Sequence, residues 1–327
     1  MNLETTWLGL KLKNPLVPSA SPLSRDLDMA RRLEDAGAAA LIMYSLFEEE
    51  ILAEEEQLSR LIEFQDLGHG EADSYLPLHP DYRSGLDEYL EQLQALKAAL
   101  DIPVIASLNG ASESGWVEHG RELEQAGADA LELNIFFIPD PTQSATEVDE
   151  RYVAILRRLR AAVRIPITVK LAPFFSSPGH LVLQLEQAGA NGVALFNRFY
   201  QPDLDLDSLE VRPQLELSAP HEALLRLHWI GKLHDRVQLS LSATGGIHGA
   251  EQALKMLLAG ASVVHQCSVL LEQGPQALTR TLDGITAWME DKEYASLRQL
   301  IGSSCQQHSI DPEAWDRINY LNTLHSY

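Results

Sequence analysis

The sequence predicts an α/β protein, a (β/α)8 barrel of the TIM-barrel kind, and three observations lead to this prediction. Four amphipathic stretches end in Ala-Gly-Ala, at residues 36–38, 126–128, 188–190 and 259–261, and each runs straight into a short apolar segment. Apolar segments without polar alternation are typical of strands that are buried on both faces of a parallel sheet. Eight such segments, each followed by a helical pattern, favour a closed barrel over an open sheet.

The eight expected strands are residues 16–20, 40–45, 104–108, 130–135, 167–172, 192–197, 238–244 and 262–268. A glycine just after a helix supplies the left-handed residue that closes it, which explains the Ala-Gly-Ala junctions. At two further junctions, Ile102-Pro103 and Ile165-Pro166, a proline ends the helix as the chain enters a strand. Leu90, Leu93 and Leu96 illustrate the spacing of three that marks a helix between strands.

Nothing in the composition divides the chain, so we expect residues 1–327 to form one domain. Residues 47–83 exceed the usual length of a βα loop, and we interpret them as an insertion after the second strand, at the active-site face. A solvated helix followed by a loop is the alternative there. Residues 291–327 follow the last barrel unit and are expected to form a helical tail.

The charge balance narrows the classes of partner. The formal net charge is −22, with 47 acidic against 25 basic residues, which disfavours nucleic acid and anionic membrane surfaces. A small phosphorylated cofactor stays compatible, because a few backbone amides and one cation suffice for one phosphate.

Cysteine usage and hydropathy point to a reducing compartment. Cys267 and Cys305 are too few for a disulfide framework, a thiolate zinc site or an iron–sulfur cluster, and we expect no metal site. The absence of a signal-like or membrane-length apolar run predicts a cytoplasmic protein that is not bound to a membrane.

The reactive groups of such barrels lie at the carboxyl ends of the strands, which gives a list of candidates. They are Ala20, Ser21, Tyr44, Ser45, Asn109, Asn134, Lys170, Asn197, Arg198, Gly245, Gly246, Cys267 and Ser268. Lys170 lies within an apolar strand, and buried lysines need a partner. That partner is either an anionic ligand or a core carboxylate such as Glu132.

The last two units carry a candidate phosphate site. Gly245-Gly246 follows the seventh expected strand, and Cys267-Ser268 ends the eighth. Barrels often bind phosphate here through loop amides and a short helix, and glycines let the backbone approach the ligand closely. An ordinary turn at Gly245-Gly246 is the alternative.

The order of the motifs resembles the dihydroorotate dehydrogenase family of flavin barrels, from about residue 8 to about residue 301. The motifs are Gly9 with Asn14-Pro15, Glu132-Leu133-Asn134, Val169-Lys170-Leu171, Thr244-Gly245-Gly246, and Cys267-Ser268-Val269-Leu270 before Gly274-Pro275. The resemblance implies a role in pyrimidine metabolism or a related reaction. It also implies bound FMN and not FAD, since nothing resembles the fingerprint for a second nucleotide.

The resemblance also implies a role for each candidate of the cofactor site. Ala20, Ser21, Ser45 and Asn109 would line the flavin, Asn134 and Lys170 would lie near its ring, Asn197 would lie at its edge or at the substrate, and Gly245, Gly246, Cys267 and Ser268 would hold its phosphate. A cation near the pyrimidine end of the ring would stabilise the negative charge that develops there on reduction.

The chain departs from the family pattern on the substrate side. The family places a cysteine or serine base three residues after the motif asparagine, where this chain has Phe137, or Ile138 if the alignment slides by one. Neither side chain accepts a proton. Tyr44 replaces a family lysine and is a candidate proton donor or a ring packed on the flavin, while Arg198 is a candidate substrate anchor or a structural ion-pair partner.

We therefore predict an FMN-dependent oxidoreductase that acts on a CH–CH bond of a small substrate, with hydride passing to or from FMN. Oxidation of dihydroorotate itself by the family route is not expected. One alternative is a non-catalytic or electron-relay flavin module that docks on a redox partner protein. Another is an aldolase that forms a Schiff base on Lys170. A homodimer is expected from the family resemblance.

Overall fold

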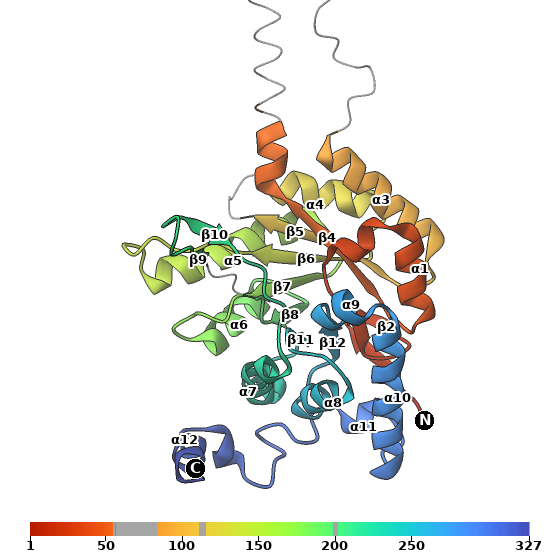
Figure 1. The fold of residues 1–327 in the computed structure, drawn as a ribbon, viewed down its shortest axis with the longest axis vertical. Helices are drawn as coiled ribbons and strands as arrows, with labels where there is room; N and C mark the ends of the chain where they lie inside the picture. The colour runs from red at the N-terminus through yellow and green to blue at the C-terminus, as the bar shows by residue number, and fades with distance from the viewer. Residues whose placement is uncertain (55, 57–83, 111–115, 199–201, 327) are drawn as a thin grey trace, which may run out of the picture.

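Eight parallel strands form the centre of the molecule in the computed structural model, which describes residues 1–54, 56, 84–110, 116–198 and 202–326. They are β3 (Leu16–Pro18), β4 (Leu41–Phe47), β5 (Val104–Gly110), β6 (Ala130–Ile135), β7 (Ile167–Leu171), β8 (Gly192–Leu195), β11 (Ser240–Thr244) and β12 (Val263–Gln266). Their order in the sheet is β3-β12-β11-β8-β7-β6-β5-β4. The Ala39 N–H donates to the Leu16 carbonyl at 2.9 Å, which brings the two ends of the sheet together. The fold is thus a nearly closed (β/α)8 barrel, as predicted (Figure 1).

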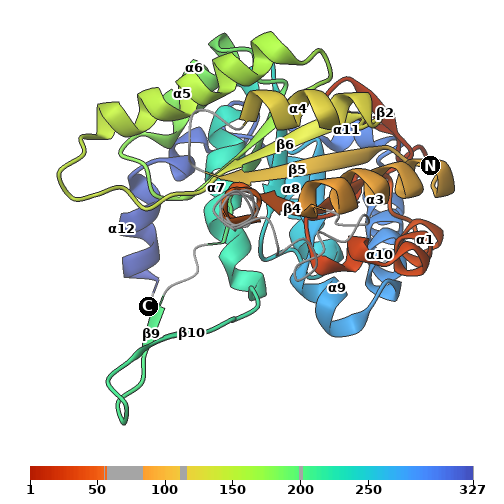
Figure 2. The same cartoon turned by 90° about the horizontal axis from the view of Figure 1, so that it is seen from above.

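Helices follow the strands and surround the barrel (Figure 2). They are α1 (Leu27–Asp35), α3 (Gly85–Ala99), α4 (Trp116–Gln125), α5 (Ala145–Ala162), α6 (Pro178–Gln187), α7 (Ala223–Leu233), α8 (Ala250–Ala259) and α10 (Gln276–Asp291). Ser84 and Ser144 begin α3 and α5 with reciprocal capping boxes, which satisfy amides that a helix start leaves unpaired. Gly127 and Gly189 have positive φ angles of 99° and 98°, as the Ala-Gly-Ala junctions predicted.

The amino-terminal end of the barrel is closed by a hairpin that the sequence patterns did not predict. Strands β1 (Thr5–Trp7) and β2 (Leu10–Leu12) pair antiparallel and place Trp7 in full burial. Trp7 packs in one apolar cluster with barrel residues that include Ile42 and Val263. Its indole N–H donates to the Ser242 hydroxyl at 2.8 Å. This end of the barrel is therefore a packed and hydrogen-bonded plug.

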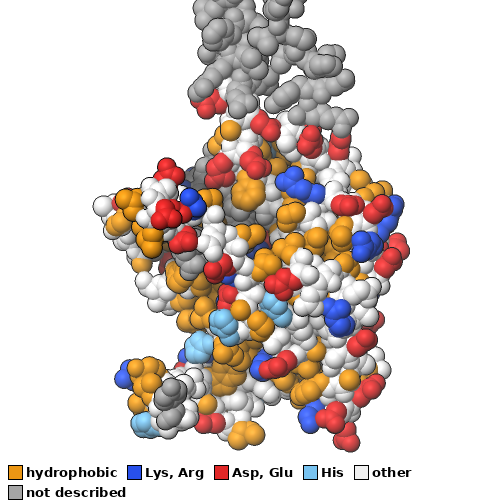
Figure 3. Space-filling model, viewed as in Figure 1, with side chains coloured by type: hydrophobic (Ala, Val, Ile, Leu, Met, Phe, Trp, Pro, Cys, Tyr) orange, Lys and Arg blue, Asp and Glu red, His pale blue; other side chains and the backbone are white. Residues whose placement is uncertain are grey.

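Further elements lie outside the repeating pattern. The strands β9 (Pro202–Leu204) and β10 (Val211–Pro213) form a protruding hairpin, and hydrophobic side chains gather at its position in Figure 3. Short helices include η1 (Pro22–Arg25), η2 (Pro220–Glu222), η3 (His234–Arg236) and α9 (Ser268–Gln273). The chain ends in α11 (Leu297–Leu300), η4 (Pro312–Trp315) and α12 (Ile318–His325).

Two expectations from the sequence can be compared with the structure only over the described residues. Most of the insertion expected over residues 47–83 lies outside the described residues, which include only 47–54 and 56 of that range. Within the described part of the chain, no helix combines the length and the apolar character needed to cross a bilayer.

Candidate active site

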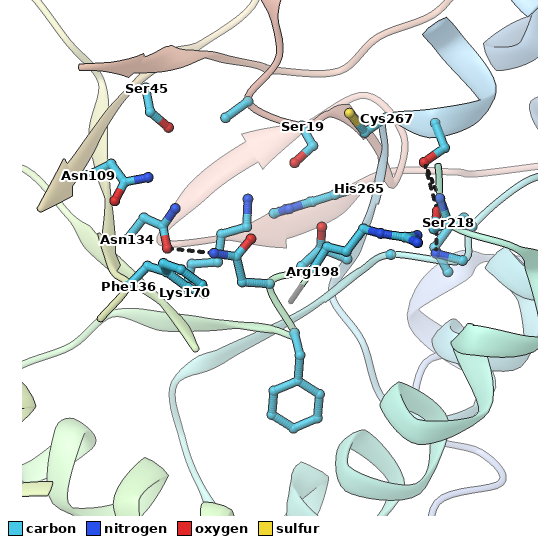
Figure 4. A pocket seen from close by; sticks show the side chains of 18 of the residues that line it. Ser19, Ser45, Asn109, Asn134, Phe136, Lys170, Arg198, Ser218, His265 and Cys267 are labelled. Carbon is cyan, nitrogen blue, oxygen red and sulfur yellow. Dashed lines mark hydrogen bonds between the residues drawn. The ribbon is translucent and has the colours of Figure 1, made fainter. Parts of the chain in front are cut away.

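A cavity of about 340 Å³ opens at the carboxyl ends of the strands, opposite the Trp7 plug. Its lining comes from all eight strands or the residues directly after them, together with Ser218 from the long connection after β8: Ser19, Ala20, Ser45, Phe47, Asn109, Asn134, Phe136, Lys170, Phe196, Asn197, Arg198, Ser218, Thr244, Gly245, Gly246, Ile247, His265, Cys267 and Ser268. In Figure 4, Ser45, Asn109 and Asn134 lie at one side, Ser218 and Cys267 at the other, and Lys170 and His265 between them. Its volume falls in the ~300–1,000 Å³ range of ligand pockets.

Most of the candidates from the sequence meet in this cavity. Those that line it are Ala20, Ser45, Asn109, Asn134, Lys170, Asn197, Arg198, Gly245, Gly246, Cys267 and Ser268. Ser21 does not line it: this buried residue precedes η1, and its carbonyl accepts hydrogen bonds from the Ser24 amide and hydroxyl. Tyr44 also lies elsewhere.

Tyr44 points away from the cavity because of a β-bulge in β4. In the register with β5, Ile42 pairs with Ile105 but Ser45 pairs with Ser107, so β4 has one extra residue between these pairs. The bulge turns Ser45 inward and leaves Tyr44 outside. There its ring makes an edge contact with Tyr89 at 4.8 Å, and the Arg25 guanidinium lies 4.2 Å from its centroid.

Lys170 is held by a chain of polar groups that crosses four neighbouring strands. Its ammonium lies 3.4 Å from Glu132 Oε1, and both side chains are buried. The Ser107 hydroxyl donates to the same oxygen at 3.5 Å and is hydrogen-bonded to the Ser45 hydroxyl at 3.0 Å. Lys170 therefore has the core carboxylate Glu132 as a partner and still borders the cavity. The two expected partners, a core carboxylate and an anionic ligand, are thus compatible with each other.

His265 is a site residue that the list of strand ends missed. It is 1% exposed and borders the cavity, yet neither ring nitrogen has a hydrogen-bond partner among the described residues. Burial, assisted by the nearby Lys170 charge, lowers the pKa of His265 to about 3, so the ring is neutral at physiological pH. Alternation along β12 could have found it, because His265 lies two residues before Cys267 and so shares its strand face.

Gly245 and Gly246 form a turn into which no larger residue fits. Their φ angles are 90° and 78°. A Cβ on Gly246 would lie 2.5 Å from the Ala223 backbone nitrogen, and one on Gly245 would lie 2.7 Å from the Arg226 guanidinium. The turn therefore requires glycine for both conformation and space.

Two hydroxyls border this turn. The Ser218 hydroxyl accepts a hydrogen bond from the Gly246 amide at 3.2 Å and is hydrogen-bonded to the Ser268 hydroxyl at 2.8 Å. The Ser268 hydroxyl also accepts from the Ser218 amide at 3.0 Å. One end of the cavity is therefore lined by backbone amides and by the hydroxyls of small side chains (Figure 4).

Two arginines lie beside the turn with different roles. Arg198 borders the cavity and forms an ion pair with Glu222 at 3.0 Å. Arg226 is buried behind the turn, where its guanidinium donates to the carbonyls of Thr244 and Glu222, each at 2.9 Å, and Phe196 at 3.3 Å. Arg226 is thus part of the scaffold, and burial lowers its pKa from the ordinary arginine value. Arg198 thus has the ion-pair partner that was one of the two roles expected for it.

Comparison with known proteins agrees with this arrangement. The family model described as dihydroorotate dehydrogenase matches residues 82–289, well over half of the chain. The chain belongs to the dihydroorotate dehydrogenase family. This confirms the family resemblance of the motifs, and it makes the protein an oxidoreductase in a family of flavin-dependent enzymes.

Individual relatives cover almost the whole chain at low identity. The catalytic subunit of dihydroorotate dehydrogenase B (NAD(+)) from Pyrococcus abyssi is 25% identical over 308 residues, covering 92% of this chain and 98% of the relative. The NAD-dependent dihydropyrimidine dehydrogenase subunit PreA of Escherichia coli K12 is 24% identical over 325 residues, covering 92% of this chain and 76% of the relative.

The segment directly after β6 contains Phe136, Phe137 and Ile138. Phe136 borders the cavity, whereas the Phe137 ring packs near Tyr152, with centroids 5.9 Å apart, and lies under the Arg151 guanidinium at 4.4 Å. Ile138 is 68% exposed and does not line the cavity. Phe137, at the position where the resemblance implies a base, thus does not line the cavity, whereas its neighbour Phe136 does.

Proposed function

We propose that this cavity binds FMN and that the protein is an FMN-dependent oxidoreductase acting on a CH–CH bond of a small substrate. The observation that carries the proposal is Lys170, a buried cation at the wall of a cavity whose other lining groups are mostly neutral. FMN, when bound, would supply the acceptor or donor of a hydride. The chain's own residues would bind it, orient the substrate and move protons.

The residues at one end of the cavity fit a phosphate. The Gly245-Gly246 turn excludes a Cβ, and its neighbours Ser218 and Ser268 contribute two hydroxyls. Ser268 also begins α9, whose first amides have no acceptor within the helix. Amides and hydroxyls of this kind bind one phosphate group without a surplus of positive charge. We assign Gly245, Gly246, Cys267 and Ser268 to the phosphate of FMN.

The other part of the cavity fits a flavin ring. Its donors and acceptors are amides and hydroxyls, and the Asn197 amide donates to the Asn134 carbonyl oxygen at 3.0 Å, so each holds the other in place. Both ring nitrogens of His265 lack a partner, which is costly for a buried polar group unless a ligand provides one. We assign Ala20, Ser45, Asn109, Asn134 and Lys170 to the ring.

Substrate binding is assigned to the side of Asn134, Asn197 and Arg198. Arg198 is neutralised in part by Glu222, so a substrate carboxylate would have to share it. Tyr44 is not assigned as a proton donor because it lies outside the cavity. Lys170 stays the cavity's candidate catalytic group, since it can stabilise charge that develops on a ligand beside it. Its ion pair with Glu132 does not favour the Schiff-base alternative.

The cofactor assignment is tested by a thermal-shift comparison of FMN, riboflavin and FAD. At equal concentration, a ligand with higher affinity for the folded state raises the melting temperature more. FMN should raise it most, riboflavin less because it lacks the phosphate, and FAD least because nothing in the sequence indicates a second nucleotide site. Equal shifts for FMN and riboflavin would remove the phosphate assignment, and no shift with any flavin would remove the whole proposal.

The reaction is tested by anaerobic mixing of the FMN-loaded protein with dihydroorotate or NADH, followed by absorbance. Because Phe137 stands where the resemblance implies a base, and Phe136 cannot accept a proton either, we expect reduction by dihydroorotate to be slow compared with family enzymes that carry a base. Fast flavin bleaching by dihydroorotate would show that another group provides the base. A panel of unsaturated ring compounds that reoxidise reduced flavin would then identify the substrate class.

We also propose that the protein works with a redox partner protein. Two relatives are named as subunits, one of them as a catalytic subunit, so these relatives function in larger assemblies. The β9–β10 hairpin exposes Leu204, Leu206, Leu209 and Val211, which are 52–81% exposed. Light scattering distinguishes a monomer from the expected homodimer, and co-purification with a flavin reductase subunit tests the partner.

A further inference from the structure

A second group of reactive side chains, none of which lines the cavity, lies where the carboxyl-terminal tail meets η3. Asp235 belongs to η3, and Cys305 and His308 follow α11. The Cys305 thiol donates to Asp235 Oδ2 at 2.9 Å, and Cys305 Sγ lies 3.4 Å from His308 Nδ1. His308 Nδ1 lies 4.0 Å from the same Asp235 oxygen. One sulfur, one nitrogen and one oxygen ligand atom thus form a compact triangle.

The size of this triangle fits a tetrahedral metal ion. Zinc binds sulfur at about 2.3 Å and nitrogen or oxygen at about 2.0–2.1 Å, so two ligand atoms on a tetrahedral zinc are roughly 3.3–3.6 Å apart. The three separations, 2.9, 3.4 and 4.0 Å, bracket this range. Small side-chain rotations of Asp235 and His308 would bring all three edges into it.

The types of donor and their spacing also suit zinc. Thiolate and imidazole are zinc's preferred protein ligands, and a carboxylate is a common third. Cys305 and His308 are separated by two residues, Gln306 and Gln307, which places both on one turn. The expectation of no metal site followed from the low number of cysteines, and a mixed set of this kind requires only one.

The surroundings are compatible with a dication. A thiolate and a carboxylate together neutralise two positive charges. Of the two cations close by in sequence to Asp235, Lys232 forms an ion pair with Asp316, and the Arg236 guanidinium is held by a hydrogen bond to the neutral Gln306 side chain at 3.1 Å. Cys305 is buried, whereas His308 and Asp235 are exposed enough to admit an ion from solvent. His308 Nδ1 also lies 3.1 Å from the Gly302 carbonyl, which it would exchange for the metal.

We propose that Asp235, Cys305 and His308 form a zinc site, with water as the fourth ligand, that fastens the carboxyl-terminal tail to the barrel. On binding, the Cys305 thiol loses its proton to solvent, and the metal replaces the thiol-to-carboxylate hydrogen bond. The site is independent of the proposed flavin function, because none of its residues lines the cavity.

The test is a titration of chelator-treated, full-length protein with Co²⁺, recorded as a difference spectrum so that any flavin absorbance cancels. A tetrahedral ion bound to a thiolate gives visible ligand-field bands and a near-ultraviolet thiolate-to-cobalt charge-transfer band. We expect both bands to saturate at one ion per chain, and Zn²⁺ to displace the cobalt. Zn²⁺ should also raise the melting temperature of the treated protein.

Variants locate the site. Cys305→Ser should abolish the charge-transfer band, while Cys267→Ser, which changes the other cysteine, should keep it. His308→Ala and Asp235→Asn each should weaken Co²⁺ binding by at least about tenfold, since loss of even an outer-shell partner costs about 10–100-fold. If Cys305→Ser does not fold, the His308→Ala and Asp235→Asn variants still test the site. No charge-transfer band in the wild type, a band that survives in Cys305→Ser, or an unchanged Co²⁺ affinity in both other variants would overturn the proposal.

Discussion

The two ends of the barrel treat their buried polar atoms in opposite ways. At the amino-terminal end, the Trp7 indole packs in an apolar cluster, meets the His265 ring edge-on with centroids 5.4 Å apart, and pairs its one N–H with Ser242. At the carboxyl-terminal end, polar atoms of His265 and Glu132 lack partners among the described residues. Because unpaired buried polar atoms cost about 1–3 kcal/mol each, the first end contributes stability, and under the proposed function a ligand would offset this cost at His265.

The largest effect should come from opening the packed end. Trp7→Ala should lower the free energy of unfolding by about 4–5 kcal/mol, because it removes a fully buried ring and leaves the Ser242 hydroxyl without its donor. Urea denaturation measures this change. The affinity of the remaining folded protein for FMN should stay the same, and a loss of FMN binding would show that the two ends are coupled.

Next in size is the loss of the cation at the open end. Lys170→Met should cost about 3 kcal/mol of stability, because Glu132 is left as a buried charge without its partner. The double variant Lys170→Met, Glu132→Gln should recover most of this stability but not the affinity for FMN. Recovery of both in the double variant would mean that Lys170 serves the fold alone.

The glycine turn should show a smaller effect on stability and a specific one on binding. Gly246→Ala combines an unfavourable φ with a 2.5 Å contact, whereas Gly274→Ala has a similar φ of 71° and open space around it. The strained backbone costs roughly 1–3 kcal/mol in each variant, and Gly246→Ala should lose the more of the two in denaturation because of its additional contact. Gly246→Ala alone should also lose FMN affinity, measured by fluorescence titration. Equal FMN affinity in the two variants would contradict a phosphate site at this turn.

The last effect is the smallest at neutral pH, where it is absent, and concerns the pH dependence of stability. Burial lowers the pKa of His265 in the folded protein to about 3, below the ordinary value of 6.5. The unfolded chain therefore binds a proton that the folded protein does not, and stability falls as the pH drops from 6.5 towards 3. The slope from this group is at most about 1.4 kcal/mol per pH unit. His265→Gln should remove that part of the slope in denaturation series at several pH values, whereas an unchanged slope would show that His265 is protonated in the folded state.

Much of the architecture was predictable because it is repeated. The bounds of all eight strands lie within two residues of the expected apolar segments, six of which follow an Ala-Gly-Ala or Ile-Pro junction. The hairpins β1–β2 and β9–β10 were not predicted, since strands of three residues carry too little periodicity to be recognised. The residue type of Trp7 predicts that it is buried, but not that it closes one end of the barrel.

The site was predictable up to the orientation of single side chains. Tyr44 and Ser45 are neighbours in sequence, and adjacent strand residues normally face opposite sides. Ser45 faces the cavity because of the bulge after Ile42. No pattern in the sequence predicts this bulge. Ser218 and Arg226 come from the connection after β8, and only folding brings them behind the Gly245-Gly246 turn.

The central claim is that the open end of the barrel holds one FMN, and it is tested most directly by the flavin content of the freshly purified protein. The protein should be yellow, and acid denaturation should release close to one FMN per chain, identified by its mass and free of FAD. A colourless protein that also fails to bind added FMN would contradict the account.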